Sequence, residues 1–217
     1  METDSATGYP ASLAVDYPER PLSRLTTFFR PITILPIALV LSTVDGAVWS
    51  GLWARNPGMQ PNSVMYVSVG AGGLLVLGPF LMILFRRKYP RPWFDWNLAL
   101  LRFSTRVGAY ALLLTDQYPS TDSDQAVHVE LRYPDNPNRW LPIVKWLLAV
   151  PHYIILFFLH IGMVVSAIIA WFAILITGRY PRPLFDYVVG VQRWTIRVFA
   201  YAVLLATDSY PPFRLSV

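Results

Sequence analysis

Two sets of charged residues have the types and the spacing of a binding stripe on a helix. In each set an aspartate is followed by an arginine seven positions later, and by a second arginine four positions after that. At about 100° per residue, residues with this spacing share one face of a helix. Arginines on one face can bind phosphate or carboxylate oxygens through charge-assisted hydrogen bonds. The two sets are Asp95, Arg102 and Arg106, and Asp186, Arg193 and Arg197.

Three roles are open for this stripe. In the simplest, the aspartate pairs with the arginines, and the stripe only fixes the position of the helix. In the second, the arginines contact lipid headgroups, another anion or a protein partner, together with Arg91 and Arg182 just ahead of the helices. The third is catalysis, but the chain has no nucleotide-binding, metalloprotease or nucleophile-elbow motif. We therefore predict no catalytic residue and no cofactor.

The motif YPRPxFD precedes each stripe and predicts where the helix begins. Two prolines forbid a regular helix through the motif itself. Asp95 and Asp186 are then expected in or near the first turn, where a carboxylate caps free N–H groups and complements the helix dipole. The alternative is that one or both are functional carboxylates.

Asp45 is an acid inside an apolar run, which makes it a functional candidate within a membrane. Trp49 and Trp53 follow it closely and indicate that the water interface is near, so Asp45 can also simply be hydrated. His152 and His160 lie eight positions apart, with no carboxylate or cysteine beside them. No metal site is predicted.

The region around the stripe occurs twice in the chain. Residues 89–114 align with 180–205 without a gap, and fourteen of the 26 aligned positions are identical. TDQYP after the first copy corresponds to TDSYP after the second, and DYPERP at Asp16 resembles RYPDNP at Arg132. Self-similarity of this extent indicates a duplication.

The composition indicates a membrane protein. Apolar residues make up 54% of the chain and charged residues only 14%, against roughly 25% charged in soluble domains. The net charge is +5, but the basic residues flank apolar segments. That arrangement is typical of membrane topology and anionic lipid contact, not of nucleic-acid binding. Cysteine is absent, which excludes disulfides.

The predicted fold is an all-α integral membrane protein of two tandem repeats. Each repeat is a transmembrane helix pair followed by an amphipathic interfacial helix. Repeat 1 covers 25–119, with spans at about 31–53 and 64–85 and an interfacial helix at about 93–115. Repeat 2 covers 140–217, with spans at about 141–160 and 162–178, a tight turn near His160 to Gly162, and an interfacial helix at about 184–206. Residues 1–24 are predicted to be a flexible cytoplasmic tail and 120–139 a polar linker.

The distribution of Lys and Arg predicts orientation. Basic residues cluster after the second and fourth spans and before the first, which places both termini and the linker in the cytoplasm. If the motif helices also crossed, the basic residues after the fourth span would face outward. We therefore expect a multi-pass protein of the plasma membrane with four spans.

The segments RWLPIVKWLLAVPHYI, RYPRPLFDYVVGVQRW and VFAYAVLLATDSYPPF resemble a bacterial, largely actinobacterial, family of membrane proteins, the domain-of-unknown-function 4389 family. The second copy is the more similar one. In the first copy, Arg-Arg-Lys replaces Thr-Gly-Arg before YPRP, and the first span lacks WLLAVPH. The resemblance implies an integral membrane protein and transfers no catalytic residues.

The expected function is non-catalytic. We expect an accessory or scaffolding subunit of a membrane assembly, or a lipid-dependent organiser, with the bilayer, anionic lipids and a protein partner or second copy as its contacts. The alternative is a small transporter or lipid-handling protein with a ligand site between the repeats.

Overall fold

The computed structural model describes residues 8–45 and 71–216, without the side chains of 43–45 and 71–75. This part of the chain is mostly helical, as predicted, but it also contains a sheet. In chain order the elements are β1 (Ala11–Val15), α1 (Arg24–Thr33), α2 (Leu35–Asp45), α4 (Ala71–Arg86), α5 (Arg91–Ala111), β2 (Val127–Leu131), α6 (Leu141–Leu148), α7 (Val150–Thr177) and α8 (Arg182–Ala202).

β1 and β2 form a two-stranded antiparallel sheet in which Leu13 pairs with Val129. Alternate side chains point to opposite faces, so Leu13 and Val129 are buried while Ser12, His128 and Glu130 are exposed. The all-α prediction was therefore wrong. The strands lie in the segments predicted as the flexible tail and the polar linker; residues 1–7 of that tail lie outside the described residues.

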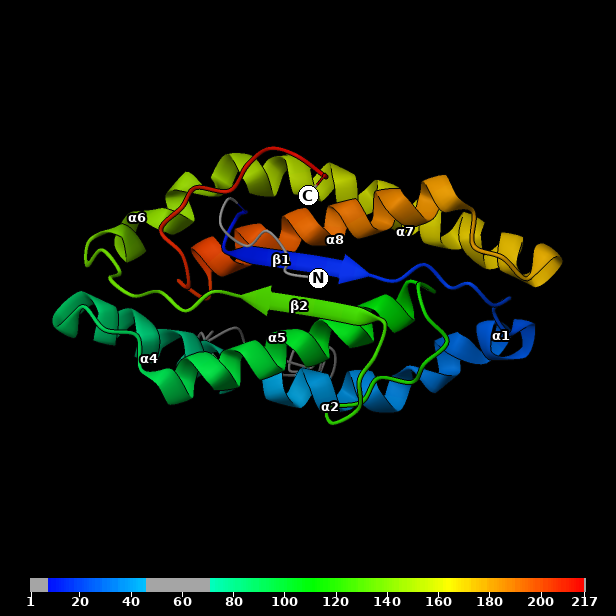
Figure 1. Ribbon diagram of the computed structural model, residues 1–217, viewed down its shortest axis with the longest axis horizontal. Coiled ribbons are helices and arrows are strands. Elements are labelled where there is room, and N and C mark those ends of the chain that lie inside the picture. The colour runs from blue at the N-terminus through cyan, green and yellow to red at the C-terminus, as the bar shows by residue number, and fades with distance from the viewer. Residues whose placement is uncertain (1–7, 46–70, 217) are drawn as a thin grey trace, which may run out of the picture.

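The two motif helices support this sheet. α8 packs against β1 and α5 against β2, and in Figure 1 the strands run in front of these two helices. Both helices begin directly after the first proline of YPRP, because the second proline falls in the first turn, where a missing N–H costs nothing. The predicted ranges, 93–115 and 184–206, began two residues late and ended four residues late.

α6 and α7 replace the predicted third and fourth spans. The chain breaks at Ala149 and is then helical without interruption for 28 residues, ending at Gly178 with a left-handed φ of 74°. The expected turn near His160 to Gly162 is therefore absent. Gly162 instead lets α7 approach α8, because a β-carbon there would overlap the Tyr187 hydroxyl.

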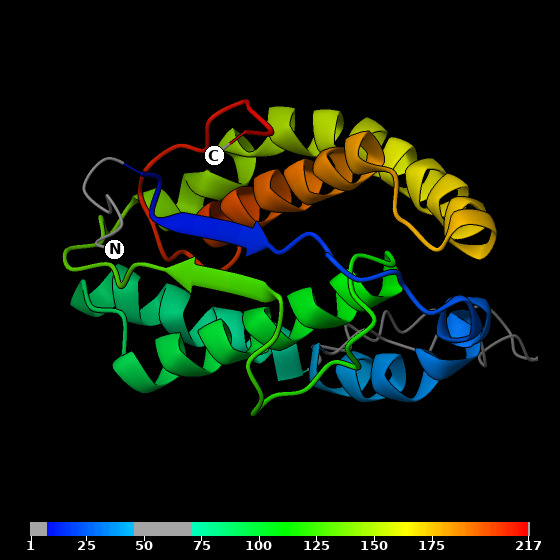
Figure 2. The ribbon, with the colours of Figure 1, turned by 45° about the vertical axis from the view of Figure 1, so that its right-hand side comes forward.

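The first half differs from the predicted spans as well. Where one span was expected at 31–53, α1 and α2 meet at Ile34, and α1 contains Pro31. The span predicted at 64–85 corresponds to α4 from Ala71 onward; its earlier residues lie outside the described part. In Figures 1 and 2, α6 and α7 run along one long edge of the molecule, and α2 and α4 along the other.

Two helical segments in the described ranges are long and apolar enough to cross a membrane, residues 24–42 and Val150–Thr177. Only 17% and 22% of their most apolar stretches are buried. The core helix of a soluble protein would be mostly buried, so these helices carry their apolar side chains on the outside.

Candidate functional site

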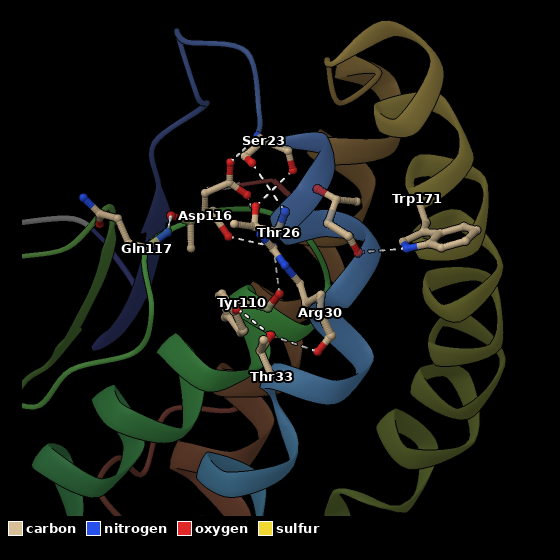
Figure 3. Close-up of polar contacts among 10 residues, drawn as sticks. Ser23, Thr26, Arg30, Thr33, Tyr110, Asp116, Gln117 and Trp171 are labelled. Atoms are coloured by element: carbon tan, nitrogen blue, oxygen red, sulfur yellow. Dashed lines mark hydrogen bonds and ion pairs between the residues drawn. The ribbon is translucent and has the colours of Figure 1, made fainter.

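A buried ion pair joins α1 to the segment that follows α5 (Figure 3). Arg30 pairs with Asp116, and its side chain is 3% exposed against 28% for the aspartate. Arg30 Nη1 also donates hydrogen bonds to the backbone oxygens of Tyr110, at 3.1 Å, and Thr115, at 2.8 Å. The guanidinium lies 4.4 Å from the centre of the Tyr110 ring. The Arg30 side chain thus connects α1 to the end of α5 and to the segment that follows α5.

The local sequence explains how this pair is held. The other oxygen of Asp116 accepts the backbone N–H of Ser23 at 2.7 Å, and Ser23 is the N-cap of α1. Trp171 of α7 donates its indole N–H to the Thr27 backbone oxygen at 3.0 Å. Figure 3 shows these contacts meeting on α1, which therefore links α5 to α7.

A second ion pair repeats this arrangement between α6 and the segment after α8. Lys145 Nζ lies 2.6 Å from Asp208 and donates to the Thr207 backbone oxygen at 2.8 Å. The other oxygen of Asp208 accepts the Asn138 N–H at 2.7 Å. The ammonium lies 5.2 Å from the centre of the Tyr201 ring. Lys145 is 1% exposed and Asp208 31%.

The two clusters use corresponding residues of the duplicated sequence. The aspartates are those of TDQYP and TDSYP, and the tyrosines, Tyr110 and Tyr201, lie 91 positions apart like the rest of the motif. Each cation is surrounded by oxygens of its own chain. The arrangement is suited to holding helices together, because the charges are already paired.

The first arginine of each stripe bonds the backbone of the sheet. Leu13 and Val129 form a non-hydrogen-bonded pair of the antiparallel ladder, so their carbonyl groups point away from the partner strand. Arg193 Nε donates to the Leu13 oxygen at 3.0 Å, and Arg102 Nε donates to the Val129 oxygen at 3.0 Å. Each arginine therefore satisfies one outward-pointing carbonyl group, on opposite edges of the sheet.

The second arginine of each stripe binds a terminal or connecting segment. Arg106 donates to the Ser120 oxygen at 2.7 Å, and Arg197 donates to the Ser216 oxygen at 2.9 Å. Burial lowers the pKa of both Arg193 and Arg197, and for Arg197 the nearby Arg214 and Arg193 cations lower it further. The stripe thus positions helices relative to the backbone around them.

Asp95 and Asp186 do not cap their helices. The N-caps are Pro90 and Pro181, without a side-chain hydrogen bond, and neither first turn holds an acid. The aspartates lie in the second turn and are exposed, and within the described ranges they form no ion pair with the arginines. The capping prediction failed because YPRP starts the helix itself.

Arg91 and Arg182 each stack on a tyrosine that lies next to one strand of the sheet in the chain. Arg91 stacks 4.3 Å from the Tyr133 ring centre, and Arg182 stacks 4.7 Å from that of Tyr17. Tyr17 donates its hydroxyl to the Tyr180 backbone oxygen at 2.6 Å.

Tyr133 bonds the Tyr89 backbone oxygen in the same way. Burial raises the pKa of Tyr89 to about 12, and burial also raises that of Tyr180. Asp45 is the last residue of α2, and its side chain lies outside those described.

The two ion pairs were missed at the sequence level. In the sequence, Asp116 and Asp208 stand out only as the aspartates of the matching segments TDQYP and TDSYP. A signal was present, because Lys145 is the single Lys or Arg between Trp140 and Thr177, and an isolated cation in an apolar segment requires a partner.

These features define a mostly helical protein with two segments able to span a membrane, in which buried cations and arginines hold the backbone. Residues 141–214, from α6 to the C-terminal segment, match the model of a family described as a domain of unknown function, DUF4389. The match supports the family resemblance for this part of the chain. No curated protein and no solved structure matches the chain.

Proposed function

We propose that this chain is a non-catalytic membrane protein that acts as an accessory or scaffolding subunit, embedded from one side of the bilayer. The observation that carries the proposal is the exposed apolar surface of α7. Phe157 and Phe158 are 63% and 65% exposed, Ile168 is 53% exposed, and the helix has no Asp, Glu, Lys or Arg along its 28 residues. A surface of this kind indicates contact with lipid.

The neighbours of α7 argue against an upright crossing. α7 runs beside α8, where Trp194 donates to His152 at 3.1 Å and Tyr187 donates to Leu159 at 3.0 Å. α8 in turn runs beside β1, as the Arg193–Leu13 contact shows. The sheet therefore lies at the level of α7, and an upright α7 would bring it to hydrocarbon depth.

Placing the sheet at that depth would be energetically unfavourable. His128 and Glu130 point out from its free face, and ionisable groups within hydrocarbon are costly. Open sheet edges exposed to lipid do not occur in membranes. We infer that α7 lies along the membrane surface with its apolar face embedded, and that the sheet faces the cytoplasm, as the basic residues predict.

We also propose that the chain consists of two tandem copies of one unit. The matching ion pairs, the matching strand-edge arginines and the equal lengths of α5 and α8 support this proposal. In such a protein the exposed sheet is the surface available to a partner, and a stoichiometric partner after gentle solubilisation is the expected result of co-purification.

Vesicle flotation tests the embedded face. The double variant Ile154→Lys and Phe158→Lys places two cations on α7, and Ser12→Lys with His128→Lys places two on the sheet. Both double variants add positive charge, so they should differ only in whether the new lysines enter lipid. A lysine within the membrane costs about 3 kcal/mol at the bilayer centre. The α7 pair should lower co-flotation with phosphatidylcholine and phosphatidylglycerol vesicles by roughly tenfold or more, and the sheet pair should not. Equal flotation of the two pairs, with both folded, would overturn the proposal.

A further inference from the structure

The two motif helices and α7 line an open pocket of about 300 Å³. On α5 it is lined by Ser104 and Thr105, and on α8 by Gln192 and Thr195, with His160 and Met163 from α7. Ser104 and Thr195 occupy matching positions in the duplication, 91 residues apart. The pocket thus lies where the two copies of the motif meet, and its volume is at the lower end for a small-molecule site.

The hydroxyl hydrogens around this pocket are already used. Thr105 donates to the Leu101 backbone oxygen at 2.6 Å, and Ser104 donates to the same oxygen at 3.1 Å. Thr195 donates to the Val191 backbone oxygen at 2.8 Å. Each hydroxyl has one hydrogen, so the lone pairs of these oxygens are what remains for a ligand.

The other two polar side chains also present acceptors. His160 Nδ1 lies 2.7 Å from the Leu156 backbone oxygen, which can only accept, so Nδ1 carries the hydrogen. In the neutral ring, Nε2 is then an acceptor, and its 3.4 Å contact with Thr195 has no hydrogen left to share. Gln192 Oε1 is buried and has no hydrogen-bond partner in the described part of the chain. A buried acceptor without a donor is costly, about 1–3 kcal/mol.

We propose that this pocket binds the hydroxyl head of an apolar molecule, such as a long-chain alcohol. A hydroxyl can donate its one hydrogen to Gln192 Oε1, the buried acceptor that has no partner in the described part of the chain. The apolar lining, including Met163 and Phe199, accepts the first carbons of the chain. An anion fits less well, because no Lys or Arg lines the pocket to offset its charge. A plain hydrocarbon would leave the acceptors unpaired. The inference goes beyond the proposed scaffolding role and does not depend on how the protein lies in the membrane.

Binding of 1-dodecanol to the full chain in zwitterionic phospholipid nanodiscs tests the proposal, with dodecyl methyl ether as the probe that lacks only the donor. The wild type should bind the alcohol at least tenfold more tightly than the ether. Gln192→Leu should remove most of this preference, and Thr195→Val, which removes a neighbouring acceptor, should reduce it less. Thr177→Val is the matched control, because Thr177 also bonds a backbone oxygen four residues earlier but lies outside the pocket.

Folding is checked by circular dichroism, and Ser104→Ala replaces any variant that fails this check. Vesicle flotation should stay at the wild-type level in all pocket variants, which separates failure of this inference from failure of the membrane proposal. Equal affinity of the wild type for alcohol and ether, no binding of either probe, or full retention of the preference in the pocket variants would each overturn the inference. Water alone in the pocket would give the first or second of these results.

Discussion

At the scale of single residues, two of the buried cations, Arg30 and Lys145, each pair with an aspartate. A charge removed from water is tolerated only when it is paired and hydrogen-bonded. Arg30 and Lys145 are almost fully buried, whereas their aspartates keep about 30% of their side-chain surface. Removing the aspartate of a pair therefore leaves a buried cation without a counter-charge, whereas removing the cation leaves a carboxylate that water can reach.

We expect Asp208→Asn to destabilise the protein more than Lys145→Met. The asparagine has a single oxygen for both Lys145 and the Asn138 N–H, so a buried cation loses its counter-charge, at about 3 kcal/mol. The methionine removes the cation and leaves a carboxylate that water still reaches, at about 1 kcal/mol. Denaturant unfolding in detergent micelles measures both. Asp116→Asn should likewise destabilise the protein more than Arg30→Met. The reverse order in both pairs would show that an unpaired buried cation is not the costlier state.

Substitution of the exposed aspartates of the YPRPxFD motifs should hardly change the stability of the protein. Asp186→Asn and Asp186→Ala, like Asp95→Asn and Asp95→Ala, are each expected to change the free energy of unfolding by less than about 0.5 kcal/mol. The reason is that both side chains point into solvent beyond the first turn. A loss near 1 kcal/mol for alanine but not asparagine in the same unfolding assay would instead reveal a cap.

At the scale of elements, the arginines of α5 and α8 complete the sheet. A two-stranded sheet exposes unpaired carbonyl groups on both outer edges. Arg193 also donates to the Leu215 oxygen at 3.1 Å, so it joins β1, α8 and the C-terminal segment.

Arg193→Gln should lower the free energy of unfolding by about 1–3 kcal/mol, because buried carbonyl groups lose charged donors. Arg182→Gln, at an exposed arginine stacked on Tyr17, serves as the matched control and should have a smaller effect. Affinity for anionic vesicles should be alike in the two variants. If Arg193→Gln instead bound anionic vesicles more weakly than the wild type and kept its stability, Arg193 would be a lipid headgroup contact.

The contact between α7 and α8 depends on Gly162. Alanine is the better helix former by about 1 kcal/mol, but its methyl group would overlap the Tyr187 hydroxyl. Gly162→Ala should therefore destabilise the protein by about 1–3 kcal/mol, and adding Tyr187→Phe should recover part of the loss. Gly108→Ala is the control, since its β-carbon would meet Gln192 at an ordinary 3.4 Å. Additive effects in the thermal melts of the two single variants and the double variant would mean that the helices are not in contact at this point.

The elements also show what sequence patterns can and cannot predict here. The prolines of YPRP and the heptad-like stripe predicted α5 and α8 to within four residues at each end, because both signals are local. β1 and β2 were missed because ASLAV and VHVEL are five residues each and pair across 116 positions. The break at Ala149 and the continuity of α7 depend on packing with α8, which an apolar run does not encode.

The candidate site was predictable only in part. The duplicated TDxYP aspartates and the isolated Lys145 were visible, but their pairing crosses 63 positions in the chain. The stripe arginines were placed correctly on one helix face; their targets were not, because strand-edge carbonyl groups carry no sequence signal.

At the scale of the whole molecule, apolar and polar surfaces are divided between elements. The exposed large apolar residues come mostly from α1, α2, α6 and α7, whereas the free face of the sheet carries Ser12, His128 and Glu130. On our proposal, the protein is embedded along α7 and exposes its sheet to water. The hydrophobic segments of the sequence alone predict four crossings, whereas two helical segments in the described ranges are long and apolar enough to cross.

The depth of α7 in the bilayer tests this account most directly. Ile154, Ile161, Ile168 and Ile176 are each at least half exposed and are spaced to lie near one face of the helix. The chain has no cysteine, so single-cysteine variants at these positions carry a spin label or a fluorophore without background. Quenching by lipid-bound and water-soluble agents then gives the depth of each label. An in-plane α7 predicts similar depths at all four positions, about 5–10 Å below the headgroups. Labels near the bilayer centre at Ile161 and Ile168, with Ile154 and Ile176 at opposite surfaces, would contradict the account and show that α7 crosses the membrane.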